Sequence, residues 1–206
     1  MVSKVILRIM VATVMMFAIL ILPTNLAVFA DAQSDIAKYT EQINENPNET
    51  ENYRARGLAY LQLKNYTKAM EDLNKAIQLD SENIPAYNLR GVCYAFLGDY
   101  AQARNDFTES IQITTQYLKR HPNDDEAYAS RGGCYALLGD YEQAIVDLNK
   151  SLQIYPSEYV YYYLGLCYKA LGDTAKANAN LKKATEEGYN PSQDVFEEAL
   201  LIMQKN

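Results

Sequence analysis

The chain has 206 residues, of which 49% are hydrophobic, and its formal net charge is -7. This length buries one core and leaves little sequence for a second domain. The acidic balance argues against nucleic acid and against anionic lipid as main partners.

Residues 1–32 differ from the rest of the chain. Two cations, Lys4 and Arg8, precede residues 9–22, which carry no charge. A basic start followed by an apolar run is typical of a secretory signal peptide. A spanning helix needs about 20 apolar residues, and this run is shorter. We therefore expect export, and an uncleaved N-terminal membrane anchor is the alternative.

The signal is expected to end at a pair of small residues. Ala30 and Ala32 flank Asp31 in an A-x-A pattern, which favours cleavage after Ala32, or failing that after Ala30. The mature protein is then expected to be secreted, periplasmic or at the cell surface. Only an uncleaved N-terminal segment would attach it to a membrane.

Four glycines mark an internal repeat with spacings of 34, 41 and 33 residues. Each has a tyrosine four positions before it and another three positions after it, an alanine twelve after and a large apolar residue sixteen after. The glycines are Gly57, Gly91, Gly132 and Gly165. Each unit is predicted to be two helices joined by a tight bend, and such units must stack because neither helix can bury its apolar stripe alone.

This pattern resembles the tetratricopeptide repeat family, with tyrosine in place of the family's tryptophan. The resemblance implies an all-α solenoid of four helix-turn-helix repeats that binds a protein or peptide and is not an enzyme. The expected segments are 1–32 (signal), 33–49 (N-terminal helix or incomplete repeat), 50–83, 84–124, 125–157 and 158–190 (the four repeats) and 191–206 (C-terminal capping helix).

The C-terminal segment is predicted to be an amphipathic helix. Asp194 is placed to cap its N-terminus, and Phe196, Leu200 and Met203 form one apolar stripe. Because the ends of a stack need covering, we expect this helix to lie on the exposed face of the last repeat.

Three repeats carry an arginine just before the glycine and an aspartate sixteen residues after that arginine. The pairs are Arg56 and Asp72, Arg90 and Asp106, and Arg131 and Asp147. In the fourth repeat Leu164 and Asn180 occupy the two positions, so arginine and aspartate are present together and absent together. This predicts a salt bridge between the two helices of each unit. Arginines that hold an anionic ligand are the alternative interpretation.

The family resemblance also implies a concave groove lined by the first helix of each unit. The residues expected on its wall are Arg54, Leu58, Leu61, Asn88, Val92, Phe96, Ala129, Gly133, Leu137, Tyr159, Tyr162, Leu166 and Lys169. Most are apolar, so we expect a groove for a protein or peptide segment with apolar anchors. Phe96 and Tyr162 are the expected main anchors because neither has an evident partner in its own unit. Alternatives are a self-associating assembly factor of the cell envelope and a non-catalytic subunit of an envelope enzyme, and the oligomeric state is left open.

No catalytic residue, metal site or cofactor is predicted. The chain has one histidine, His121, and no Cys-x-x-Cys pair. Cys93, Cys134 and Cys167 each lie two residues after a repeat glycine, where the first unit has Ala59. That recurrence predicts small buried core residues without disulfides.

Seven additional residues lengthen the second helix of the second unit by about two turns. They form either a projecting edge for a partner or a longer helix that packs on its neighbour.

Overall fold

The computed structural model of the protein describes residues 29–190 and 194–205. The uncharged run at 9–22 lies outside the described residues. Residues 29–45 are helical, so both expected cleavage positions fall at or near the start of the described helix. No helix among the described residues is long and apolar enough to cross a membrane.

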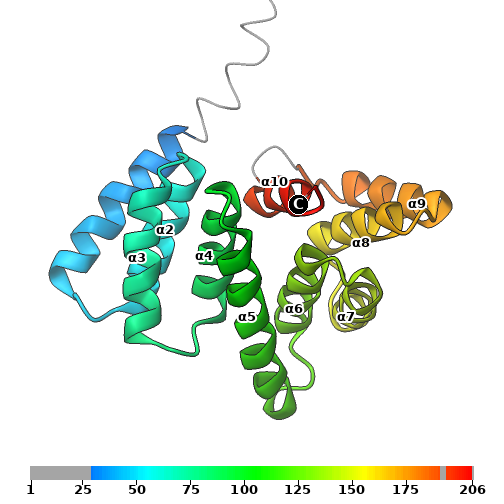
Figure 1. Cartoon of the computed structure of the whole chain (residues 1–206), viewed down its shortest axis with the longest axis horizontal. Coiled ribbons are helices and arrows are strands. Elements are labelled where there is room, and N and C mark those ends of the chain that lie inside the picture. Colours follow the sequence, from blue (N-terminus) through cyan, green and yellow to red (C-terminus); the bar gives the residue numbers. More distant parts are fainter. Residues whose placement is uncertain (1–28, 191–193, 206) are drawn as a thin grey trace, which may run out of the picture.

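Four helix pairs follow, and the chain is the all-α solenoid expected from the repeat (Figure 1). The pairs are α2 (Thr50–Gln62) with α3 (Tyr66–Leu79), α4 (Ile84–Phe96) with α5 (Tyr100–Arg120), α6 (Asp125–Leu138) with α7 (Tyr141–Ile154), and α8 (Glu158–Ala170) with α9 (Thr174–Glu186). Residues 50–184 are all described and contain no strand. A last helix, α10 (Val195–Met203), completes the order.

The tight bend inside each pair is built by a residue with positive φ followed by an N-cap. In the last three pairs the glycine before the N-cap has φ of 81°, 87° and 80°, a region that costs other residues more. Lys64 takes this place in the first pair with φ of 57°. The following side chain then accepts a hydrogen bond from the first turn of the next helix; the caps are Asn65, Asp99, Asp140 and Asp173.

The repeat glycines allow the two helices of a pair to approach closely. A Cβ atom on Gly91 would lie 2.6 Å from Cε1 of Phe107, a fully buried side chain sixteen residues later. A Cβ atom on Gly57 would lie 3.0 Å from Cγ of Leu73 at the equivalent position. The glycine and the large apolar residue therefore recur together because one fills the space that the other leaves.

The extension of α5 packs on its neighbour. Thr114 and Leu118 are buried, and Thr115 Oγ1 accepts a hydrogen bond of 3.0 Å from Arg131 of α6. Tyr117 donates to Asp124 Oδ2 in the loop before α6, at 2.9 Å. Of the two alternatives, the structure favours the longer packed helix over a free projecting edge.

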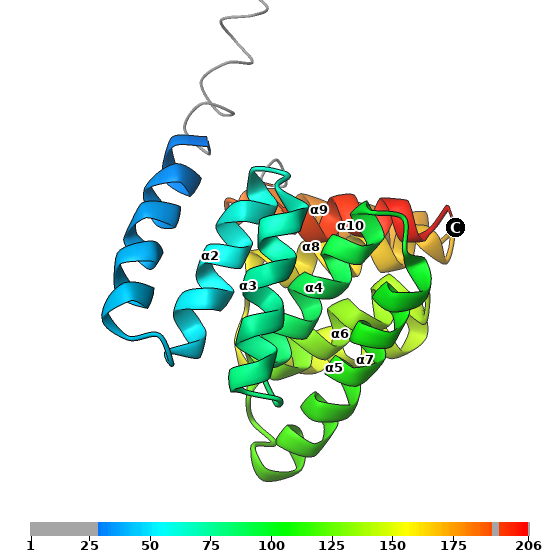
Figure 2. The same ribbon diagram turned by 60° about the vertical axis from the view of Figure 1, so that its left-hand side comes forward.

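The position of α10 differs from the expectation. It crosses the concave face against α4 and α6, and both views place it beside α4 (Figures 1 and 2). The expectation that it would cover the end of the stack is wrong because α9 needs no cover. The outer surface of α9 carries exposed charges such as Lys176, Lys182 and Lys183, whereas α10 buries its apolar side chains against α4 and α6.

Candidate functional site: the concave groove

The groove is the concave surface formed by α2, α4, α6 and α8, the first helices of the four pairs, and α10 lies in it. Beside α10 a cavity of about 320 Å³ remains between α4, α6 and α8. Five residues expected on the groove wall meet in this cavity: Asn88, Ala129, Gly133, Leu137 and Tyr159. The structure thus brings together expected wall residues from the second, third and fourth repeats.

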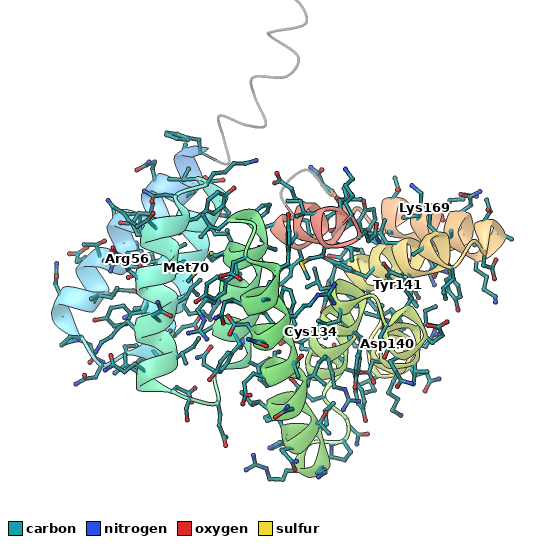
Figure 3. All side chains as sticks on the ribbon, in the orientation of Figure 1. Arg56, Met70, Cys134, Asp140, Tyr141 and Lys169 are labelled. Atoms are coloured by element: carbon teal, nitrogen blue, oxygen red, sulfur yellow. The ribbon has the colours of Figure 1, made fainter. Side chains whose placement is uncertain are left out.

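The other expected wall residues do not line this cavity. Leu61 and Val92 are buried in the core. Leu58, Phe96 and Leu166 are half-buried and pack against the core. Arg54 forms an ion pair with Glu51 on its own helix, and Lys169 is exposed on α8 (Figure 3). Most of the expected wall residues outside the cavity are therefore taken up by packing within the stack.

The two expected anchors already have partners in the folded chain. The Phe96 ring stacks on Tyr66 of the first pair, with centroids 5.2 Å apart. The Tyr162 ring lies 4.6 Å from that of Tyr189, and its hydroxyl donates to Glu197 of α10. The expectation considered only the helix pair that carries each residue, and it therefore missed these partners, which lie outside that pair.

Tyr159 is the aromatic residue that remains open to the cavity. Its ring is half-buried, and its hydroxyl makes no hydrogen bond to any described residue. Burial raises the pKa of its hydroxyl to about 12, so the group stays a neutral donor at physiological pH. An aromatic ring with a free polar tip suits contact with a protein partner.

A fixed polar group lies on the floor of the cavity. Asn88 of α4 donates from Nδ2 to Ser130 Oγ at 2.9 Å, and Cys134 Sγ donates to Asn88 Oδ1 at 3.0 Å. Burial raises the pKa of the Cys134 thiol to about 12, which keeps this sulfur protonated. Figure 3 shows Cys134 in the interior of the solenoid. The cluster holds the carboxamide of Asn88 in one orientation between two repeats.

The N-terminus of α10 is attached to α8 by hydrogen bonds. Asp194 caps its own helix by accepting from the backbone N–H groups of Phe196 and Glu197. The same carboxylate accepts from Tyr163, at 2.8 Å, and from Tyr189. Burial, followed by these carboxylates, raises the pKa of Tyr163 well above its usual value, so its hydroxyl remains a donor.

The arginine pairs lie in the seam between the helices of each unit and do not face the groove. Arg56 holds Asp72 by two bonds, Nε to Oδ2 at 2.8 Å and Nη2 to Oδ1 at 2.7 Å. The other two pairs repeat this geometry: Arg90 with Asp106, and Arg131 with Asp147. Figure 3 shows Arg56 between the N-terminal helix and α3. Two nitrogens of each guanidinium therefore donate to a carboxylate of the same unit. This favours a salt bridge between the helices over a site for an anionic ligand.

Each arginine also reaches the preceding unit, a contact that the sequence did not reveal. The third donor, Nη1, bonds a side chain sixteen residues earlier, at 2.8 to 3.0 Å. The acceptors are Thr40, Asn74 and Thr115. All three accept through a side-chain oxygen, but the residue is threonine in two units and asparagine in the other. The sequence therefore shows no single recurring residue at this position. One arginine therefore joins three helices.

The cysteines are buried and form no disulfide. Burial raises the pKa of Cys93 and Cys167 to about 12, as it does for Cys134. Among the described residues no group of three histidine, cysteine or acidic side chains could hold a metal ion.

Several cavity residues were missed from the sequence. They are Ser130, Cys134, Tyr163, Asp194 and Phe196. The last two come from α10, whose apolar stripe was recognised but assigned to the end of the stack. The polar composition of α9 was the available signal that the stripe belonged elsewhere.

Comparisons with known proteins agree with the repeat. Tetratricopeptide repeat models match residues 83–157, 57–98 and 159–187. A search of curated proteins gave no match.

A comparison with solved structures also found matches, and the one with a thermophilic TPR protein shows the same fold. TTC0263, a thermophilic TPR protein in Thermus thermophilus, is 20% identical over 86% of this chain and 95% of its own, with a TM-score of 0.64. MamA is 25% identical over 77% of this chain and 89% of its own, with a TM-score of 0.48. A second MamA, residues 41 to the end from Desulfovibrio magneticus RS-1, is 18% identical over 75% of this chain and 84% of its own, with a TM-score of 0.50.

The matches to the family models reach into all four helix pairs. The close approach of the two helices in each pair explains why glycine and a large apolar residue recur in the sequence. The chain belongs to the tetratricopeptide repeat family.

Proposed function

We propose that this protein is an exported, non-catalytic scaffold that binds a protein partner in its concave groove. The observation that carries the proposal is the cavity between α4, α6 and α8, which stays open beside α10 and is lined mainly by apolar side chains. Contact surfaces of this kind concentrate binding energy in a few aromatic and aliphatic anchors. Tyr159 and Leu137 are the anchors that this cavity offers.

Export rests on the N-terminal pattern of cations, apolar run and small residues. N-terminal sequencing of protein purified from its native host tests it. A mature chain beginning at Gln33 or Asp31 supports export with cleavage. An intact terminus in the membrane fraction supports the anchored form.

A photo-reactive phenylalanine at position 159 tests the groove in the native host. Val146 on α7 is the matched control because it is 61% exposed and lies on a second helix of a pair, away from the cavity. We expect a discrete protein adduct from position 159 and none from position 146. An adduct from position 146 alone would place the binding site on the outer surface and overturn the proposal.

A further inference from the structure

The groove already holds one helix, and its contacts show what kind of ligand fits. The side chains of Ala199, Leu200 and Met203 are 0%, 1% and 4% exposed where α10 lies against α4 and α6. Leu201, on the opposite face of the same helix, is 47% exposed. The groove therefore accepts a single apolar face of an amphipathic helix, as in other helix-in-groove complexes.

The groove also recognises the charge at the start of that helix. The Tyr162 and Tyr163 hydroxyls donate to Glu197 and Asp194, two carboxylates of the cap and first turn of α10. A third carboxylate, that of Glu198, pairs with Lys64 Nζ at 3.0 Å. Three donors of the groove thus meet three carboxylates at one end of the helix, and this fixes the direction of a bound helix as well as its face.

We propose, on the basis of the function proposed above, that the partner presents an amphipathic helix with the pattern of α10 and that α10 competes with it. The pattern is a carboxylate at the cap and in the first turn, followed by apolar residues with the spacing of Phe196, Leu200 and Met203. Bound partner and docked α10 exclude each other because both need the same surface of α4 and α6.

The cavity explains how a partner can displace a tethered helix. A segment of the same chain has an effective concentration in the millimolar range, so a partner with identical contacts would compete poorly. The cavity is lined by Asp194 and Phe196, at the N-terminal end of α10, and it is unfilled by α10. A partner whose chain continues before the acidic turn would bury apolar side chains there against Tyr159 and Leu137. Filling this space would add to the apolar contacts that α10 already makes.

The first test measures binding of a fluorescent peptide with the sequence of residues 194–205 to the full-length chain. Replacing Leu200 by alanine weakens the docked α10, so we expect the peptide to bind at least about tenfold more tightly. Leu201→Ala is the matched control on the exposed face and should leave the affinity unchanged. Unchanged affinity in Leu200→Ala would overturn the proposal.

A milder variant protects the test against a loss of folding. Glu198→Lys places two cations together at an exposed site, and we expect peptide affinity to rise about threefold. The exchanged pair, Lys64→Glu with Glu198→Lys, restores the contact for the docked helix and should bring the affinity back toward the wild-type value. Circular dichroism checks that the helical content of each variant is retained. A Glu198→Lys variant that binds the peptide no better than the wild type contradicts competition.

A reversible clamp gives the converse test. Lys64→Cys with Glu198→Cys supplies two exposed thiols, while the three native thiols are buried. We expect a cleavable bis-maleimide across them to abolish peptide binding, and cleavage to restore it. If the clamped protein binds the peptide as well as the free protein, α10 is not a competitor.

The outcomes also separate this inference from the proposed function. If the clamped chain still yields the adduct from position 159, the groove binds a partner but α10 does not regulate it. If the peptide behaves as expected but position 159 gives no adduct, the groove binds helices but the scaffold function fails. If Leu200→Ala forms dimers in light scattering, the occupant is a second copy of this chain, and the proposal of a distinct partner is overturned.

Discussion

The first three repeats and the fourth differ at the seam between their two helices. In the first three an arginine pairs with a buried aspartate and also reaches the preceding repeat. In the fourth Leu164 is fully buried at the arginine position, and Asn180 bonds a backbone carbonyl of its own helix. Both versions fold into the same helix pair. The helix pair itself does not require the ion pair. What the fourth repeat lacks is the further bond from arginine Nη1, which couples a repeat to the one before it.

The fourth repeat is coupled to the rest by another route. The hydroxyls of Tyr162 and Tyr163 on α8 bond the first turn of α10, which in turn packs on α4 and α6. The first three repeats are therefore joined side by side through arginines. The fourth packs on the third through α7 and α8 without such an arginine, and α10 also links it to earlier repeats across the groove.

The largest expected effect comes from breaking one seam. Replacing Arg131 by leucine leaves Asp147, which is 4% exposed, without its counterion. We expect the free energy of unfolding to fall by about 3 kcal/mol, because an unpaired buried charge costs more than the pair contributes. Urea unfolding measures the loss. Arg104→Leu, at an exposed position on α5, is the control, and an equal loss there would contradict the role of the seam.

The second and fourth repeats are also expected to differ, by a smaller amount, in the stability that is lost when the repeat glycine is replaced. A Cβ atom at Gly91 meets Phe107 and one at Gly165 meets Leu181, both at 2.6 Å. Phe107 is fully buried, whereas Leu181 is partly exposed and can shift. We expect Gly91→Ala to cost about 2 kcal/mol and Gly165→Ala about 1 kcal/mol, measured by urea unfolding. Equal costs would show that the fourth repeat is packed as tightly as the second.

Gly133 supplies the control for these substitutions. It lies in a helix, and no atom would lie within 4 Å of an added Cβ. Gly133→Ala should therefore raise the free energy of unfolding by about 0.5–1 kcal/mol, because alanine loses less backbone entropy in a helix.

Giving the third repeat the two seam residues of the fourth should restore most of the stability that Arg131→Leu removes. In Arg131→Leu with Asp147→Asn neither charge is left unpaired, and we expect stability within about 1 kcal/mol of the wild type. The same urea measurement applies. A double variant as unstable as Arg131→Leu alone would mean that the third repeat cannot use the arrangement of the fourth.

The smallest effect is on thiol reactivity. Burial raises the pKa of Cys93 and Cys167 from 9.0 to about 12, so the folded thiols stay protonated where unfolded ones ionise. Their contribution to stability is therefore complete below pH 9 and falls as the pH rises from 9 toward 12. At pH 8 labelling requires local opening, and we expect Cys167 in the terminal repeat to react before Cys93. Mass spectrometry of partly labelled protein orders the sites, and equal rates would show that the repeats open as one unit.

The repeat and its seam could be predicted because they recur within one chain. Four copies of the glycine and tyrosine pattern specify four helix pairs, and the joint loss of arginine and aspartate in the fourth identifies a contact. The acceptors on the preceding repeat vary between threonine and asparagine, so no pattern marks them.

The groove could be predicted only in part. Asn88 and Tyr159 line the cavity because the position of a residue in a repeat determines which way it faces. The partners of Phe96 and Tyr162 could not be predicted, because Tyr66, Tyr189 and Glu197 all lie outside the helix pair that carries each residue. The contact with Glu197 also depends on where α10 docks. An apolar stripe shows that a helix will be covered, but it does not show by which surface.

The contact between Lys64 and Glu198 spans 134 residues, so α10 closes a loop that contains every helix from α3 to α9. Each helix pair can form from local contacts as it leaves the ribosome, whereas α10 docks only after the repeats have been made. The groove therefore exists before its cover, and a nascent or clipped chain that lacks α10 exposes apolar surface that proteases and chaperones recognise.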